Sequence, residues 1–148
     1  MQYRIACKIE KRNMNLWRND MKYNDLIPEM VVSDIEKSKE FYINHLGFKI
    51  EYEREEDKFV FLSLNEIQLM LEQGTDEELS MMKYPFGNGV NFSFGVENVE
   101  KIYKKLKEKN YPIKRDIEKR YFRVNDQILT PTEFSILDPD GYYIRITD

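Results

Sequence analysis

The feature that most constrains this chain is an internal repeat. Residues 29–42 and residues 93–106 read alike: each begins with a short apolar stretch, continues with a polar pair and ends in a segment of helical periodicity. Ile35 matches Val99, and Tyr42 matches Leu106. A repeated strand, cap and helix predicts a duplicated supersecondary unit and a site built between the two copies.

Length and composition place this repeat in one globular domain. A chain of 148 residues, 41% of them apolar, can bury a core without disulfides. The net charge of −4 argues against a nucleic-acid partner, which needs clustered Lys and Arg. Cys7 is the single cysteine, so no disulfide framework is expected and a cytoplasmic location is favoured. Neither a membrane span nor a signal peptide is expected, because the apolar runs are too short.

Composition also divides the chain. Residues 11–20 are polar and lack periodicity, so residues 1–20 are predicted to be an N-terminal appendage. Two alternatives stay open: the protein begins at Met21, or residues 2–8 add an edge strand, since apolar and polar side chains alternate there. Residues 21–148 are expected to form a single domain with module one at 24–73, a linker at 74–89 and module two at 90–148.

Module one is expected to hold one helix and four strands. Ser33 and Glu36 have the spacing of a capping box, and a helix over 34–46 places Ile35, Tyr42 and Leu46 on one face. Gly47 is expected to end this helix, because glycine tolerates the left-handed conformation. The expected strands are residues 26–32, 48–54, 58–64 and 66–72.

Module two is expected to repeat this order. Asn98 should cap a helix over 99–110, and Asp138-Pro139-Asp140-Gly141 should form a type I turn before the last strand. The expected strands are residues 90–96, 113–119, 133–137 and 142–147. Residues 127–132 show no pattern and are expected to be a loop.

Short motifs accompany this organisation: Val-Val-Ser-Asp34, Ser38-Lys-Glu-Phe-Tyr42, Leu46-Gly-Phe48, Gln68-Leu-Met-Leu-Glu72 and Asp138-Pro-Asp-Gly-Tyr142. In this order the chain, over roughly residues 24–148, resembles the vicinal oxygen chelate superfamily, which includes glyoxalase I, bleomycin-resistance proteins and extradiol dioxygenases. The resemblance implies an α+β fold in which two βαβββ modules form a curved mixed sheet around a cleft. It does not by itself imply an activity, because one fold hosts many chemistries.

The resemblance also points to four positions where metal-dependent members carry His, Gln or Glu. The residues found there are Ile27, Met70, Asn91 and Arg145. Isoleucine has no lone pair, methionine sulfur is a soft ligand and arginine is positively charged, so only the Asn91 amide could coordinate a hard cation. We therefore expect no metal and no cofactor. His45 is the one histidine and is expected to be a surface residue near a helix end, away from the cleft.

Strand alternation predicts which side chains line the cleft. The predicted ligand-binding residues are Glu29, Gln68, Met70, Glu72, Asn91, Ser93, Tyr143 and Arg145. Their neighbours, expected to face the helices, are Pro28, Met30, Leu69, Leu71, Phe92, Phe94, Ile144 and Ile146. Phe59 and Phe61 share one face of their strand, and alternation alone leaves open which face that is. A buried Arg145 needs a carboxylate partner, and Glu29, Glu72 and Glu133 are the candidates.

Among branches of the family, the metal-free bleomycin-resistance type resembles this chain best. The resemblance implies a homodimer that binds or sequesters an amphipathic, possibly cationic, small molecule without chemistry. Two alternatives stay open. One is a glyoxalase-like or fosfomycin-resistance-like metalloenzyme (lyase, isomerase or transferase) with atypical ligands. The other is a regulatory or structural module that has lost small-molecule function.

Overall fold

The computed structural model describes residues 21–148, and the expectations for residues 1–20 lie outside them. Sheet one contains β1 (Glu29–Val32), β2 (Lys49–Arg54), β3 (Phe59–Leu64) and β4 (Ile67–Gln73) in the order β1-β4-β3-β2. Sheet two contains β5 (Asn91–Gly95), β6 (Ile113–Lys119), β9 (Thr132–Leu137) and β10 (Tyr143–Thr147) in the order β5-β10-β9-β6.

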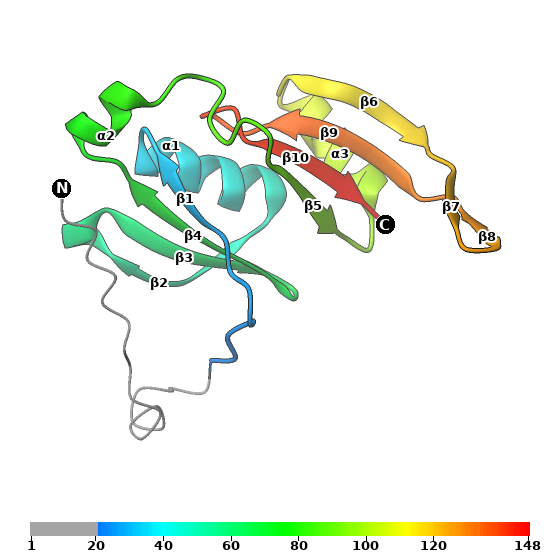
Figure 1. The fold of residues 1–148 in the computed structure, drawn as a ribbon, viewed down its shortest axis with the longest axis horizontal. Helices are drawn as coiled ribbons and strands as arrows, with labels where there is room; N and C mark the ends of the chain where they lie inside the picture. The colour runs from blue at the N-terminus through cyan, green and yellow to red at the C-terminus, as the bar shows by residue number, and fades with distance from the viewer. Residues whose placement is uncertain (1–20) are drawn as a thin grey trace.

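The two sheets have the same topology (Figure 1). In each, the first strand of the module pairs in parallel with the last, and the remaining pairs are antiparallel. The helix that follows the first strand is α1 (Ile35–Lys39), continued by η1 (Glu40–Leu46), in module one and α3 (Val99–Glu108) in module two. This arrangement confirms the expected α+β fold with two βαβββ units.

The helix ends follow from local hydrogen bonding. Asn98 caps α3 through its Oδ1, which accepts from the Lys101 amide as expected. In module one the cap is Asp34, not Ser33, because the Asp34 carboxylate accepts from the amides of Glu36 and Lys37. Gly47 ends η1 with φ of 92°, a left-handed conformation that glycine adopts without strain.

The linker at 74–89 includes a short helix, α2 (Asp76–Met81), begun by a capping box between Thr75 and Glu78. Two expectations, about a loop and about a strand end, were wrong. Residues 127–132 are not a loop: β8 (Gln127–Leu129) pairs with β7 (Phe122–Val124) in a separate hairpin. The first strand begins at Glu29 rather than residue 26, and Leu26, which was expected to lie in it, is 82% exposed.

One hydrophobic core joins both modules. It includes Met30, Leu69, Leu71, Phe94, Ile144 and Ile146, all predicted to face the helices, and Phe92 packs against its edge. The turn before β10 ties the modules together. Asp140 Oδ2 accepts from the Ser33 amide at 3.0 Å, and the Tyr142 hydroxyl donates to the Val31 carbonyl at 2.9 Å.

The carboxylate of Asp138 lies buried at the base of that turn. It accepts hydrogen bonds from the amides of Asp140 and Tyr142 and from the Tyr42 hydroxyl, 3.0 Å away. Gly141 donates to the Asp138 carbonyl and closes the expected turn. Burial raises the pKa of Asp138 to about 6 despite these hydrogen bonds, which act in the opposite direction.

Candidate functional site

Each sheet has one face on the core and one face turned away from the helices, which we call its open face. On sheet one, strand register places Phe59 beside Glu72 and Phe61 beside Met70. Residues paired across an antiparallel ladder share a face, so both phenylalanines lie on the open face. Val60 and Leu62 point the other way and belong to the core.

Aromatic rings form a wall on the open face of sheet one. Tyr52 stacks on Phe59 and on Phe61, with ring centroids 5.9 and 5.3 Å apart. The guanidinium carbon of Arg54 lies 3.8 Å from the centroid of Phe59, and Arg54 Nε donates to Asp57 at 2.7 Å. The wall therefore already holds a planar cation from the chain itself.

Two carboxylates adjoin this wall. Glu29 on β1 and Glu72 on β4 approach closely enough to interact. The pKa of Glu72 is raised, first by burial and then by a hydrogen bond with Glu29 and by its negative charge; Arg54 acts in the opposite direction. Module one thus gathers negative charge beside flat apolar rings.

The segment before β1 lies against the same face. Gln68 Oε1 accepts from the Asn24 amide at 2.8 Å, and Gln68 Nε2 donates to the Lys22 carbonyl at 2.7 Å. Between these residues, Tyr23 packs on Phe61 with ring centroids 5.5 Å apart. Gln68 was expected to contact a ligand; in this structure it holds the backbone of residues 22–24.

The open face of sheet two has a different character. Asn91 and Ser93 are exposed on β5, while Tyr143 and Arg145 are half-buried on β10. Arg145 Nε lies 3.6 Å from Glu133 Oε1, and Arg120 Nε lies 3.8 Å from the same oxygen. Glu133, one of the three expected candidates, is thus the partner of Arg145 and is only 3% exposed. Ser135, opposite Arg145 on β9, buries a hydroxyl that has no hydrogen-bond partner among the described residues.

Three of the four positions that the resemblance assigns to metal ligands do not fit a hard divalent cation, and Asn91 alone offers an amide oxygen. Met70 offers only sulfur, Ile27 offers no donor, and Arg145 is a cation already paired with Glu133. No group of three His, Cys, Asp or Glu side chains gathers in residues 21–148 in a way that could hold a metal. His45 packs against Phe41 and Tyr111, remote from both open faces.

The environment of His45 differs from the one expected. The residue is half-buried, and burial followed by the charge of Lys109 lowers its pKa. A histidine that compensates the dipole at a helix C-terminus would instead have a raised pKa, because the dipole favours the charged ring. His45 therefore acts as a packing residue between the helices.

The predicted site residues fall into two groups, one on each open face. Strand pairing places Glu29 opposite Met70, Asn91 opposite Tyr143 and Ser93 opposite Arg145. Sequence reasoning missed the aromatic wall. The two-residue turn at Asn65-Glu66 fixes the register of β3 on β4, so counting outward from it would have placed Phe59 beside Glu72.

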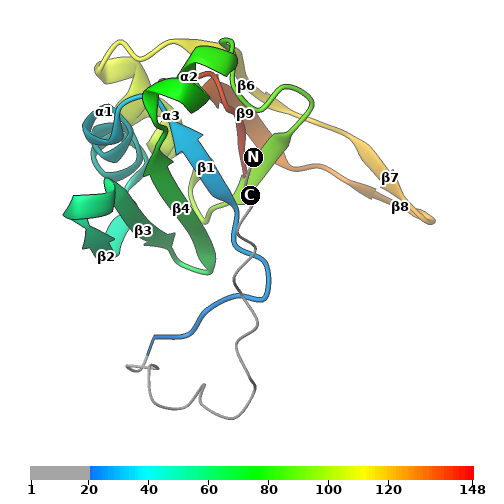
Figure 2. The same ribbon diagram turned by 60° about the vertical axis from the view of Figure 1, so that its left-hand side comes forward.

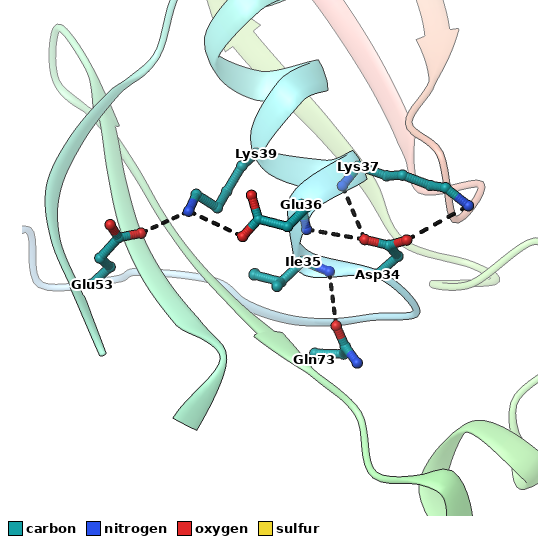
Figure 3. A network of polar contacts seen from close by, with 7 residues as sticks. All are labelled: Asp34, Ile35, Glu36, Lys37, Lys39, Glu53 and Gln73. Carbon is teal, nitrogen blue, oxygen red and sulfur yellow. Dashed lines mark hydrogen bonds and ion pairs between the residues drawn. The ribbon is translucent and has the colours of Figure 1, made fainter. Parts of the chain in front are cut away.

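A separate pocket of about 590 Å³ lies between the start of α1 and the turn that joins β2 to β3. Figure 3 shows the polar network beside it: Lys39 Nζ lies 2.8 Å from Glu53 and 3.2 Å from Glu36, and Gln73 Oε1 accepts from the Ile35 amide at 3.1 Å. Glu55, Lys58 and Phe59 complete the lining.

Solved structures resemble this chain over most of its length. A glyoxalase/bleomycin resistance protein/dioxygenase superfamily member from Vibrio splendidus is 32% identical, with 80% of this chain and 92% of that one covered, at a TM-score of 0.39. A protein of the same description from Alicyclobacillus acidocaldarius is 20% identical at a TM-score of 0.59, with 86% and 93% covered. A lactoylglutathione lyase from Agrobacterium tumefaciens is 16% identical at 0.54, with 85% and 95% covered.

Other comparisons bear on class and on membrane association. A search of curated proteins finds no match. Within residues 21–148, no helix has the length and apolar character to cross a membrane. The sequence model of the Glyoxalase/Bleomycin resistance protein/Dioxygenase superfamily matches residues 26–146, which span both modules and both open faces. The chain belongs to that superfamily.

Proposed function

We propose that this protein is a metal-independent binder of an amphipathic, cationic small molecule, of the bleomycin-resistance type, and that the ligand docks on the open face of sheet one. The observation that carries the proposal is the position of Arg54. The Arg54 guanidinium stacks on Phe59 next to the carboxylate of Glu72. The positive charge of Arg54 acts to lower the pKa of Glu72. A ligand with a planar cationic group would take the place of Arg54 on the ring of Phe59, beside the same carboxylate.

The chemistry of the face favours this ligand class. Flat rings stack with aromatic groups, and cations are attracted to the ring face and to the nearby carboxylates. Burial and Glu29 make the ionised form of Glu72 less favourable, and a bound cation would relieve that cost. Binding should therefore release protons and weaken as the pH falls through the pKa of Glu72.

The test is calorimetry with bleomycin as the probe. Replacing Glu29→Gln and Glu72→Gln together keeps the shape and removes the charge. Each lost contact is expected to cost about 1–3 kcal/mol, so affinity should fall at least about tenfold. The matched control is Glu100→Gln with Glu108→Gln, two exposed α3 residues with the same total charge change.

Two outcomes would contradict the proposal. Wild-type protein that fails to bind bleomycin and other planar cations would remove its basis. Binding that both double variants retain equally would show that the face does not select by charge. A thermal-shift series with Zn²⁺, Ni²⁺ and Mn²⁺ tests the metalloenzyme alternative, because a cation that binds the native state raises the melting temperature.

A further inference from the structure

Another pocket lies at the end of sheet two where β6 begins and β9 finishes, beside the linker that runs from α2 to β5 (Figure 2). Its volume is about 410 Å³, within the range of about 300–1,000 Å³ that is usual for small-molecule sites. Its walls include Tyr84, Tyr111, Ile113, Lys114, Leu137 and Pro139. None of the residues predicted to bind a ligand is among its lining residues, so the pocket is separate from the cleft that the family resemblance implies.

Two tyrosine rings form the aromatic walls of this pocket. The Tyr111 hydroxyl donates to the Leu137 carbonyl at 2.7 Å, and the Tyr111 ring packs on Phe41 with centroids 5.1 Å apart, so this ring is held in place. Tyr84, from the linker, is 64% exposed. Its ring lies over Gly141, where an added Cβ atom would come within 2.8 Å of Tyr84 Cε2. Flat walls of this kind favour a planar ring as the ligand.

The charge that a ligand can reach in this pocket is positive. Lys114 is exposed and forms no ion pair within residues 21–148. The other charged residue of the lining, Asp138, is only 2% exposed. The Asp138 carboxylate already accepts hydrogen bonds from two backbone amides and from the Tyr42 hydroxyl. A ligand can therefore pair with the Lys114 ammonium, whereas the acceptor positions of Asp138 are taken.

We propose that this pocket is a second binding site, for a small aromatic molecule that carries a carboxylate or sulfonate group. The ring of the ligand packs against Tyr84 and Tyr111, and its anionic group pairs with Lys114. Burial of the ring supplies most of the affinity, while the ion pair with an exposed lysine adds a smaller part and sets the charge preference. This ligand is opposite in charge to the one proposed for sheet one, so each site can be tested without the other.

The test uses two fluorescent probes on the full chain. The first is 8-anilinonaphthalene-1-sulfonate, an aromatic sulfonate whose fluorescence rises in apolar surroundings. The second is N-phenyl-1-naphthylamine, which has the same rings without the sulfonate and is the matched neutral probe. Titration of the wild type with the sulfonate should saturate at one molecule per chain, and raising the salt concentration should weaken its binding.

Charge reversal tests the role of the lysine. Lys114→Glu should weaken binding of the sulfonate about fivefold or more, because an attraction is replaced by a repulsion, and should leave the affinity for the neutral probe within about twofold of wild type. Lys101→Glu is the control with the same change of charge and should alter neither affinity. Lys101 is an exposed residue of α3 and, in the part of the chain that the structure describes, it also forms no ion pair.

Truncation tests the role of the linker tyrosine. Tyr84→Ala should weaken binding of both probes about tenfold, whereas Tyr84→Phe should retain it, since the ring makes the contact. The control is Tyr121→Ala, which removes a ring that is 73% exposed just before β7. Glu29→Gln with Glu72→Gln should leave both affinities unchanged, because those residues belong to sheet one.

Near-UV circular dichroism shows whether each variant keeps its native packing. Four results would overturn the proposal. They are a wild type that does not bind the sulfonate at a saturable site, equal loss of sulfonate binding in Lys114→Glu and Lys101→Glu, equal loss in Tyr84→Ala and Tyr121→Ala, and loss of binding in the Glu29 and Glu72 variant.

Discussion

The open faces of the two sheets share a topology but hold their charges differently. On sheet one, Glu29 and Glu72 lie side by side, and the pKa of Glu72 is raised first by burial and then by Glu29. On sheet two, Glu133 is more deeply buried, yet two guanidinium groups, Arg120 and Arg145, approach the same oxygen. One face keeps an excess of negative charge, while the other supplies its own counter-charges.

This difference separates residues that are poised for a ligand from residues that stabilise the fold. A bound cation stabilises the ionised form of a carboxylate whose pKa is raised, and it can also stack on an adjacent ring. A further cation does not stabilise a carboxylate that lies between two arginines, because the negative charge is already balanced. Arg145 was predicted from the sequence to contact a ligand, but it pairs with Glu133 within the sheet. Equivalent strands of the two modules therefore carry side chains with different roles.

The largest expected effect comes from breaking the balance on sheet two. Glu133→Gln leaves two arginines without their shared carboxylate and should lower the free energy of unfolding by about 2 kcal/mol. That is less than for a fully buried pair, because both arginines reach solvent. Urea denaturation measures it. Glu118→Gln, which removes an exposed partner of Arg120, is the control and should change stability by less than about 0.5 kcal/mol.

The second effect concerns Asp138, which lies between the modules and belongs to neither open face. The pKa of Asp138 is about 6 in the folded protein, compared with the ordinary value of 3.8 that applies to the unfolded chain. The native state therefore binds a proton more readily than the unfolded state. Its contribution to stability is therefore present at low pH and lost as the pH rises through 6. From pH 5 to pH 7.5 the loss should be about 1.4 kcal/mol.

Asp138→Asn tests this contribution, because an amide does not titrate in this range. Chemical denaturation at both pH values should show a smaller difference in the variant than in the wild type. An identical pH dependence in the two proteins would show that other groups account for it. The wild-type free energies of unfolding at these two pH values also serve as the reference for the Glu29 and Glu72 variants.

The smallest effect is expected on sheet one. Glu72→Gln removes a repelled charge rather than a paired one, so the free energy of unfolding should stay within about 0.5 kcal/mol of wild type. In Glu29→Gln, NMR titration should find the pKa of Glu72 lowered toward its ordinary value, with the part due to burial remaining. A loss of stability as large as that of Glu133→Gln would erase the distinction between the faces.

The sequence predicted the fold well because the repeat and the alternation of strand residues are local signals that packing reinforces. Met30, Leu69 and Ile144 lie in the core as alternation required. It failed at β7 and β8, whose side chains are exposed and so leave no pattern of burial to find. It also chose Ser33 over Asp34 as cap, since both residue types cap helices and only the backbone conformation decides between them.

The candidate site was less predictable than the fold. Glu133 was one of three candidate partners named for Arg145, whereas the backbone of residues 22–24 as the partner of Gln68 was not expected. Such pairings depend on how segments distant in sequence approach one another. The sequence did not identify Arg54 as a site residue, because its role depends on contact with the ring of Phe59 on the neighbouring strand.

The turn that joins the modules also sets an order of events during synthesis. The Val31 carbonyl and the Ser33 amide receive their partners from Tyr142 and Asp140, more than 100 residues later. Because translation proceeds from the N-terminus, module one emerges from the ribosome while the groups that hold β1 to module two are still missing. These hydrogen bonds must therefore wait for the last residues of the chain, whereas the contacts of Phe41 with Tyr111 and of Phe48 with Phe94 need only module-two residues that are made earlier.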